Sequence, residues 1–328
     1  MLEICQFGAG RIGQIHAGNV AANGRARLRY VVDVNASAAE ALAAKHGAKP
    51  STTEAALADP AVKAVLIASS TDTHADLIEA AARAGKAIFC EKPIDLSLPR
   101  VDACVKVVKQ AGVPFFIGFN RRFDPNFAAL RAALQQGAVG RVETVTITSR
   151  DPAPPHPAFI ATSGGMFRDM MIHDFDMAHW LLGQVPVELF AYASCLVDPM
   201  FSAAGDVDTA VVVMKTADGV LCQITNSRRA VYGYDQRVEV FGSAGLLQAG
   251  NVTPTTVSRW GADGVVADKP LPFFLQRYAG AYRAELDHFI DCCLGDAKPV
   301  VQPEDGRIAL VIAEAAVESV KRGTPVKM

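Results

Sequence analysis

The chain has 328 residues, which is too many for one small core and suits two domains. Half of its residues are apolar, a fifth are charged, and the formal net charge is −2. This balance is ordinary for a globular protein and provides no basic surface for nucleic acid or anionic lipid. No apolar run reaches about eighteen residues, so no membrane span is expected. The first residues also lack the pattern of a secretory signal.

The seven cysteines are odd in number, form no C-x-x-C pair and mostly lie in apolar runs. Such thiols are typical of reduced, buried positions rather than of disulfides or a redox centre. We therefore expect structural thiols and a cytoplasmic location.

The first third of the chain alternates short apolar runs with Ala-rich stretches that have helical spacing. Strands are expected at 2–7, 28–33, 63–68, 86–90 and 114–118, and helices at 11–23, 36–46, 74–84 and 97–111. Strand–helix alternation with short loops builds a parallel sheet with helices on both faces. Residues 1–122 are therefore predicted to form a Rossmann domain of the α/β class.

The pattern changes after about residue 122. Helices are expected at 124–136, 165–182, 276–294 and 303–321, and strands at 141–150, 186–196, 207–217, 219–228, 235–242 and 245–249. Short turns between successive strands, such as 217–219, favour antiparallel pairing. Residues 123–328 are therefore predicted to form an α+β domain with an open, mostly antiparallel sheet.

A glycine-rich segment, Gly8-Ala9-Gly10-Arg11-Ile12-Gly13, follows the first predicted strand and opens the first predicted helix. In this context Gly8 permits a tight turn, Gly10 lets the backbone approach a pyrophosphate, and Gly13 lets the helix pack on the strand. The free N–H groups at the start of the helix would bind phosphate. The alternative is a glycine turn that only packs.

Asp33 stands twenty residues after Gly13, at the end of the second predicted strand. A carboxylate there accepts hydrogen bonds from both ribose hydroxyls and repels a 2′-phosphate, and the next residues, Val34 and Asn35, offer no arginine for that phosphate. We therefore expect NAD rather than NADP. FAD is a further alternative, which the lack of long insertions disfavours. The alternative to ribose binding is that Asp33 only caps the next helix.

Ligands of open α/β sheets bind outside the carboxyl ends of the strands, so the loops at that edge can contact the cofactor. Ser69, Thr71 and His74 follow the third predicted strand and are expected to line the nicotinamide ribose. The alternative is a helix cap at Thr71 or Thr73, and both interpretations can hold at once.

The fourth and fifth predicted strands also end in polar residues. Glu91, Lys92 and Pro93 follow the fourth, where the proline ring ends the strand and fixes the turn. An isolated lysine would be an ordinary surface residue, but this one stands beside the expected nicotinamide. Asn120 and Arg122 follow the fifth strand, where arginines can hold a polar substrate or bridge the domains.

The segment 165–176 carries a candidate general base. Oxidation of an alcohol with NAD requires a group that takes a proton, and a histidine with a pKa near about 6.5 suits that work. At about 100° per residue, Asp169, His173 and Asp176 fall within about 60° of one another. The alternative is that these residues form only the solvated face of an amphipathic helix. Lys, Glu and Gln are more usual than Asp and His on such a face.

A metal site is the competing chemical interpretation of the same helix. His173 and His179 are six residues apart, about 120° around a helix, and do not converge on one ion. The sequence has no cysteine cluster for zinc. We therefore expect no metal.

The glycine turn, the Glu91-Lys92-Pro93 tripeptide and the Asp169-x-x-x-His173 spacing resemble the glucose–fructose oxidoreductase/inositol dehydrogenase (Gfo/Idh/MocA) family. The resemblance covers the whole chain. Segments 118–124, 163–176 and 228–237 are similar to its inositol 2-dehydrogenase branch.

This resemblance implies roles for individual residues. Lys92 would hold the substrate hydroxyl and contact the cofactor, His173 would be the general base, and Asp169 would orient that histidine. Further cofactor contacts would come from Glu91 and Asn120. The polyol would be contacted in addition by Arg122, Asp176 and Tyr232. His156 is expected to contact it as well, from a loop outside the segments that carry the resemblance.

The loop 155–159, which contains His156, departs from the branch and is expected to lie over the substrate pocket. The preferred inositol isomer or sugar therefore stays open. Members of the family are commonly tetramers with the open sheet buried between subunits, which implies a homotetramer here.

The expected function is NAD-dependent oxidation of a ring hydroxyl of myo-inositol, or a close isomer such as scyllo-inositol, to the ketone. Two alternatives stay open. One is an aldose or other sugar dehydrogenase on the same scaffold, and the other is a non-catalytic NAD(P)-binding regulator. Fold alone does not decide between them.

Overall fold

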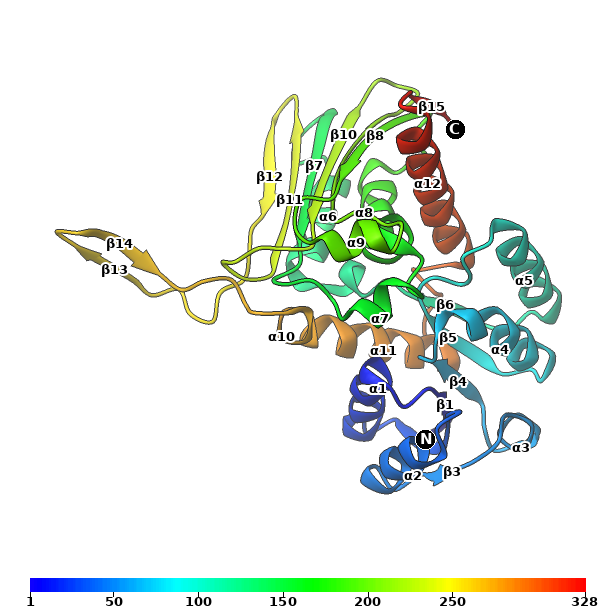
Figure 1. Ribbon diagram of the computed structural model, residues 1–328. Coiled ribbons are helices and arrows are strands. Elements are labelled where there is room, and N and C mark those ends of the chain that lie inside the picture. The colour runs from blue at the N-terminus through cyan, green and yellow to red at the C-terminus, as the bar shows by residue number, and fades with distance from the viewer. The chain divides into compact units, whose positions relative to one another are not determined.

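A computed structural model describes all 328 residues, which form two compact units (Figure 1). The first unit contains residues 1–123 and 281–310, and the second contains 124–280 and 311–328. Residues 281–310 thus pack with the N-terminal part of the chain, which the sequence pattern did not indicate. As functional domains, 1–122 and 123–328 stay a prediction.

The first unit is built on a six-stranded parallel sheet with the order β3-β2-β1-β4-β5-β6. Its strands are β1 (Leu2–Phe7), β2 (Ala26–Val32), β3 (Lys49–Pro50), β4 (Ala64–Ile67), β5 (Ala87–Glu91) and β6 (Phe115–Gly118). Strands β4 and β5 are buried at every position, as expected for strands covered on both faces. The predicted Rossmann arrangement is confirmed. Strand β3 was not predicted, because two residues carry no periodic pattern.

Helices cover both faces of this sheet, and Figure 1 shows α1 and α4 on opposite sides of it. The helices are α1 (Arg11–Ala22), α2 (Ala36–Lys45), α3 (Thr53–Ala58), α4 (Thr71–Arg83), α5 (Leu98–Ala111) and a 3₁₀ turn, η1 (Asn120–Phe123). Helix α11 (Ala279–Leu294) returns to this unit, where Phe289 packs edge-on against Phe89 at 5.6 Å between ring centres.

The second unit contains a seven-stranded sheet with the order β12-β11-β7-β10-β9-β8-β15. Only β7 and β10 pair in parallel, so the predicted mostly antiparallel sheet is confirmed. A separate hairpin, β13–β14, was not predicted. The strands are β7 (Val142–Arg150), β8 (Glu188–Ser194), β9 (Thr209–Lys215), β10 (Leu221–Ser227), β11 (Asp235–Gly242), β12 (Gly245–Ala249), β13 (Ser258–Gly261), β14 (Gly264–Ala267) and β15 (Val326–Lys327).

Helices lie on one face of this sheet, and its other face is open (Figure 1). The remaining helices are α6 (Pro125–Gln135), α7 (Pro157–Ile160), a π-helical turn η2 (Met166–Met170), α8 (Ile172–Leu182), α9 (Pro199–Ala203), α10 (Phe274–Arg277) and α12 (Pro303–Arg322). The backbone N–H of Ala191 in β8 donates to Ser319 Oγ of α12 at 3.0 Å. No helix of the chain has the length and apolar content needed to cross a membrane.

The expectation of one regular helix over 165–182 is wrong. A π-helical turn occupies Met166–Met170, and α8 begins only at Ile172. Met171 N–H donates to Met166 O at 2.9 Å, five residues back, so this turn holds more residues than an α-helical turn. The even spacing of 100° per residue therefore does not apply between Asp169 and His173.

The start of this broken helix is held by an aspartate from a distant loop. Asp206 Oδ1 accepts the N–H of Met166 at 3.0 Å. Gly165 has φ +82, and a Cβ there would lie 2.8 Å from the same oxygen. The loop before β9 therefore fixes where the segment carrying Asp169 begins.

That loop depends in turn on the buried carboxylate of Asp208. It accepts N–H groups from Leu196, Val197 and Asp198 at 2.8–3.1 Å and the hydroxyl of Thr209 at 2.9 Å. Burial alone would raise the pKa of Asp208, but these hydrogen bonds outweigh it and hold the pKa below its ordinary value.

We predict that Asp208→Asn lowers the free energy of unfolding by about 1–3 kcal/mol at neutral pH, because the amide cannot accept all of these hydrogen bonds. The folded-state pKa is depressed, so the stabilisation is present above the unfolded pKa of about 3.9 and is lost as the pH falls through the folded value. Urea unfolding at a series of pH values should therefore show that the difference in the free energy of unfolding between wild type and Asp208→Asn becomes smaller in acid. Asp263→Asn, at the exposed tip of the β13–β14 hairpin, is the control and should change little.

Candidate active site

The turn between β1 and α1 has the shape of a dinucleotide cradle. Gly8 has φ +100, and a Cβ there would lie 2.3 Å from Ala68 O. A Cβ on Gly13 would lie 2.2 Å from Gly8 O, whereas a Cβ on Gly10 would meet nothing within 4 Å. Gly10 therefore faces open space, where a ligand can approach the backbone. The buried Gln6 amide, which sequence reasoning missed, donates to Gly8 O and Gly13 O at 2.8 Å each.

Helix α1 begins at Arg11, and its N-cap, Gly10, provides no side-chain cap. The first N–H groups of the helix are therefore directed at the cradle, where a phosphate can accept them. Asp33 Oδ2 accepts Ala9 N–H at 2.7 Å and Oδ1 accepts Asn35 N–H at 2.8 Å. Each oxygen keeps a further acceptor site for a ribose hydroxyl. The residues present thus fit NAD.

The loop after β4 differs from the expected helix cap. The N-cap of α4 is Ser70, and its side chain makes no capping bond, so the alternative interpretation of a cap at Thr71 or Thr73 is wrong. Both threonines lie inside the first turn, where Thr73 Oγ1 contacts Ser69 Oγ at 2.7 Å and donates to Ser70 O at 2.8 Å. Ser69 and Thr71 are half-buried.

His74 is almost completely buried and connects two loops at this edge. Its Nδ1 lies 2.7 Å from Pro93 O, and its Nε2 lies 3.2 Å from Ser69 O. Burial lowers the pKa of His74, so the neutral ring carries one proton, and the shorter contact favours Nδ1 as its donor. The ring thereby holds the turn that carries Lys92.

Lys92 itself follows β5 and is half-buried, with a cis peptide bond to Pro93. Arg122 lies in η1, where Nη2 pairs with Asp305 at 2.9 Å and Nη1 donates to Val300 O at 3.3 Å. Arg122 thus contacts the returning segment of the first unit. Asn120 of the same turn is buried as well.

In the second unit, Asp169 has a partner that the sequence did not predict. Arg228, which follows β10, donates from Nη2 to Asp169 Oδ2 at 3.2 Å and from Nη1 to Asp151 Oδ2 at 3.1 Å. Its guanidinium is 6% exposed. A buried arginine between two aspartates fixes the position of both carboxylates. The only sequence signal was an arginine at a strand end.

His173 is the second residue of α8 and is half-buried. Its neighbours Asp174 and Asp176 are buried. Asn226 of β10 donates to Asp174 Oδ2 at 2.6 Å, which ties the first turn of α8 to the sheet. The backbone that carries His173 is therefore anchored on the strand that precedes Arg228.

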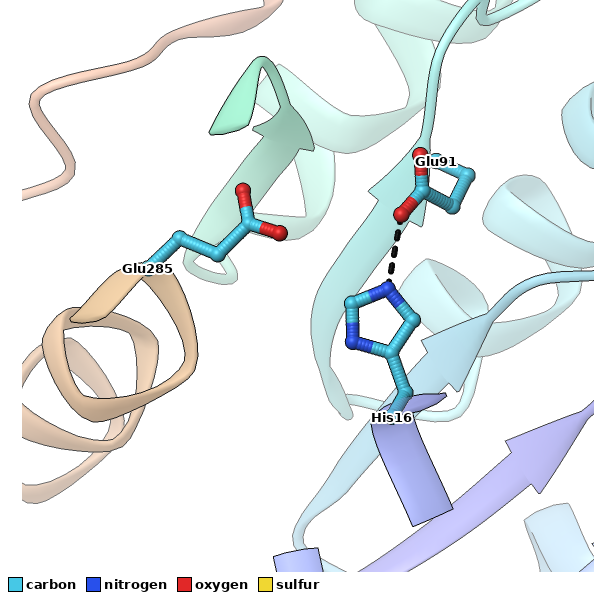
Figure 2. Close-up of side chains that lie close together, drawn as sticks. All are labelled: His16, Glu91 and Glu285. Carbon is cyan, nitrogen blue, oxygen red and sulfur yellow. Dashed lines mark hydrogen bonds and ion pairs between the residues drawn. The ribbon is translucent and has the colours of Figure 1, made fainter. Parts of the chain in front are cut away.

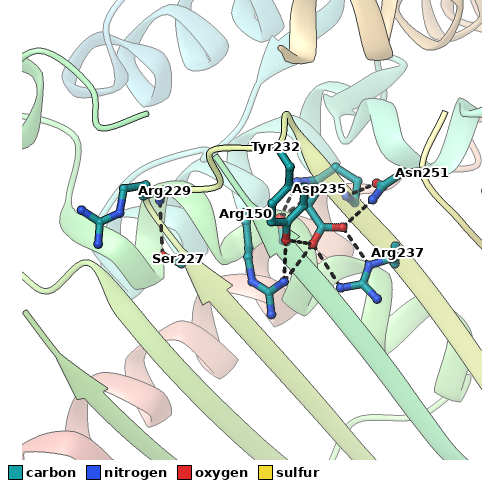
Figure 3. A network of polar contacts seen from close by, with 9 residues as sticks. Arg150, Ser227, Arg229, Tyr232, Asp235, Arg237 and Asn251 are labelled. Atoms are coloured by element: carbon teal, nitrogen blue, oxygen red, sulfur yellow. Dashed lines mark hydrogen bonds and ion pairs between the residues drawn. The ribbon is translucent and has the colours of Figure 1, made fainter. Parts of the chain in front are cut away.

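Tyr232 and His156 have local partners. Figure 3 shows Tyr232 in a network around the buried Asp235: its hydroxyl donates to Asp235 Oδ2 at 2.6 Å and receives a hydrogen bond from Arg150 at 2.8 Å. Burial would raise the pKa of Asp235, but hydrogen bonds, the first of them from Arg237, hold it below its ordinary value. His156 is the N-cap of α7 and accepts Ala158 N–H at 3.3 Å.

Comparison with known proteins bears on both units. Residues 3–119 match the family described as "Oxidoreductase family, NAD-binding Rossmann fold", and residues 127–248 match the "GFO/IDH/MocA C-terminal domain". An inositol 2-dehydrogenase of Rhizobium meliloti is 50% identical, over 96% of this chain and 95% of its own. A myo-inositol 2-dehydrogenase of Thermotoga maritima is 46% identical, over 100% and 98%.

A solved structure gives the same result for the fold. The scyllo-inositol dehydrogenase of Lactobacillus casei with bound NAD(H) and scyllo-inositol superposes with a TM-score of 0.91 at 27% identity, over 100% of this chain and 99% of that one. The chain described here therefore belongs to the GFO/IDH/MocA family of oxidoreductases, and its first unit is the NAD-binding Rossmann domain of that family.

Proposed function

We propose that this protein oxidises a ring hydroxyl of a cyclic polyol, myo-inositol or a close isomer such as scyllo-inositol, to the ketone. NAD, when bound, accepts the hydride. The observation that carries the proposal is the presence, on one chain, of the Asp33-bearing dinucleotide cradle and of Lys92, Asp169 and His173. The full-length similarity to relatives named inositol 2-dehydrogenases supports the choice of substrate.

His173 is the proposed general base. Oxidation removes a proton from the hydroxyl oxygen as the hydride leaves the carbon, and a neutral imidazole nitrogen takes that proton. Lys92 donates a hydrogen bond to the same oxygen, which stabilises the negative charge that develops there. Asp169 orients the histidine and favours its protonated form.

The fixed position of Asp169 supports this role. Its carboxylate is held by the buried Arg228, which also pairs with Asp151, so the three groups form an array with one positive and two negative charges. The array keeps one net negative charge, which can stabilise a protonated histidine. Cofactor contacts are assigned to Glu91, Asn120 and the loop residues Ser69, Thr71 and His74, and polyol contacts to Arg122, His156, Asp176 and Tyr232.

We also infer a homotetramer. The open face of the second sheet exposes large apolar side chains, with Tyr192 at 70% and Leu246 at 51%. Val211 and Val213 of β9 and Phe241 of β11 lie on the same face. Large apolar side chains exposed on an open sheet face are typical of a subunit interface. A second copy of the sheet is the proposed cover.

A cytoplasmic location is proposed on the state of the cysteines. All seven are free thiols, and five of them are buried. Burial raises the pKa of Cys5 and Cys222 to about 12, so these thiols are unreactive at neutral pH. Free thiols in this number are usual in a reducing compartment.

We expect the purified protein to reduce NAD with myo-inositol or scyllo-inositol and to turn over aldoses more slowly. The measurement is absorbance of reduced cofactor across a panel of inositols and aldoses. Turnover of aldoses and of no inositol would contradict the proposal and show that the protein is a sugar dehydrogenase. Absence of turnover with every polyol and aldose, together with tight NAD(H) binding, would favour a non-catalytic regulator.

His173→Ala should lower kcat by about 10²–10⁴-fold with the affinity for NADH retained, because the variant loses the proton acceptor and leaves the cofactor cradle intact. Stopped-flow absorbance and a fluorescence titration of NADH separate the two effects. His179→Gln, on the same helix, is the matched control and should keep most of the activity. An unchanged rate in His173→Ala would refute the assignment of the base.

Asp33 should determine the preference for NAD. The double variant Asp33→Ser, Val34→Arg removes the carboxylate and places a cation at a fully exposed position, so we expect the ratio of kcat/KM for NAD over NADP to fall by about tenfold or more. The comparison is made at fixed polyol concentration. A wild-type preference for NADP would contradict the role given to Asp33.

A further inference from the structure

Three ionisable side chains meet inside the first unit, away from its surface. His16 comes from α1, Glu91 from the end of β5, and Glu285 from α11 (Figure 2). His16 and Glu285 are fully buried, and Glu91 is 9% exposed. One ligand-type atom from each lies within 4.8 Å of the others. Burial of such groups is costly, so their presence together calls for an explanation.

A hydrogen bond joins two of the three. His16 Nε2 lies 2.7 Å from Glu91 Oε1. The imidazole is held edge-on between Phe89, at 5.0 Å between ring centres, and Tyr282, at 5.7 Å. The orientation of the ring is therefore fixed by packing, and its Nε2–H is directed at the carboxylate.

Glu285 completes the cluster in an unusual state. Its two oxygens are buried and have no hydrogen-bond partner. Burial, together with the charge of Glu91, raises the pKa of Glu285 well above its ordinary value, which favours the neutral form of this carboxyl. Figure 2 shows it extending from α11 toward the His16–Glu91 pair. In its neutral form Glu285 packs beside His16 and Glu91 without adding a second negative charge to the cluster.

Each of the two residues next to Lys92 contacts a histidine, Glu91 through its side chain and Pro93 through its carbonyl. Glu91, which precedes it, is bound by His16, and Pro93, which follows it, offers its carbonyl to His74 Nδ1 at 2.7 Å. The Glu91 side chain also packs against Gly118, where a Cβ would lie 3.1 Å from Oε2. Lys92 therefore stands on a short segment with little freedom to move.

His16 also lies three residues after Gly13, on the helix whose first turn forms the dinucleotide cradle. One hydrogen bond thus connects the helix that binds phosphate to the residue before Lys92. We propose that His16, Glu91 and Glu285 are positioning residues, which hold the Lys92 turn at a fixed place relative to the cofactor cradle. The proposal rests on the function proposed above for Lys92.

A metal site is the competing interpretation of the same three residues. Tetrahedral zinc, with bonds of about 2.0–2.1 Å, separates its ligand atoms by about 3.3 Å. His16 Nε2 and Glu91 Oε1 are closer than this and stand at ordinary hydrogen-bond distance. The geometry therefore favours the hydrogen bond.

The test uses His16→Leu, which removes the donor, and His16→Gln, whose amide can donate to Glu91. We expect His16→Leu to lower kcat by about 10²-fold, the scale of a displacement of about 1 Å, with little change in the affinity for NADH. His16→Gln should restore most of the rate. Hydrogen exchange at the amide of Lys92 should be faster in His16→Leu and near wild type in His16→Gln.

Two further variants separate positioning from general destabilisation. Val108→Ala shortens a buried side chain of α5 elsewhere in this unit, and it should lower the melting temperature without a selective loss of kcat. Gly118→Ala displaces the Glu91 carboxylate while every polar group remains, so it should lower kcat partially even if His16→Leu does not fold.

The proposal is overturned by wild-type kcat in a folded His16→Leu, by no rescue in His16→Gln, or by unchanged exchange at Lys92. Stoichiometric zinc in the purified protein, lost in Glu285→Gln, would overturn it in favour of the metal site. If the wild-type enzyme oxidises no polyol, the proposed function fails, whereas hydrogen exchange and NADH affinity still decide whether the hydrogen bond holds the turn.

Discussion

The close packing of the turn after β1 against the end of β4 and against helix α1 is the constraint on which the first unit depends. It exists because Gly8 and Gly13 have no side chains: a Cβ on either would lie within 2.3 Å of a backbone oxygen. The Gln6 amide then holds both glycine carbonyls from inside the sheet. With the helix so placed, its N–H groups reach the ligand edge, and His16, one turn further on, reaches the end of β5. Cofactor binding and the placement of Lys92 therefore share one cause.

The second unit positions its polar groups in another way. Two carboxylates on the broken helix are held by partners from other segments, Asp169 by Arg228 and the buried Asp174 by Asn226. The N–H of Met166 is capped by Asp206. A buried charge without such a partner would cost several kcal/mol, so these pairs determine where the segment can lie. The π-helical turn adds backbone length where Asp169 must turn toward Arg228.

The sequence predicted what local pattern determines. Apolar runs located every strand except the two-residue β3 and β15 and the β13–β14 hairpin. The glycine turn with Asp33 identified the dinucleotide cradle. What it missed depends on partners far along the chain. Arg228 pairs with Asp169, which is 59 residues away in the sequence, and Arg122 pairs with Asp305, which is 183 residues away. Residues 281–310 likewise pack with the first unit although they follow most of the second. The π-helical turn was also missed, because an argument from periodicity assumes regular α-helical geometry. Here Gly164 and Gly165, together with the distant Asp206, determine how the helix begins.

The choice between an inositol and an aldose depends on how firmly such polar groups are fixed. The two kinds of ring differ by little more than a hydroxyl-bearing carbon in place of a ring oxygen. An apolar pocket discriminates poorly against so small a change, but a buried group that must hydrogen-bond a hydroxyl can reject a substrate lacking it by about 10⁴–10⁵-fold. A buried carboxylate of this unit such as Asp174, which Asn226 holds at 2.6 Å, has a fixed position and cannot turn to solvent. Selectivity of that size therefore requires the rigid partner network of the second unit as much as the identity of the contacting residues.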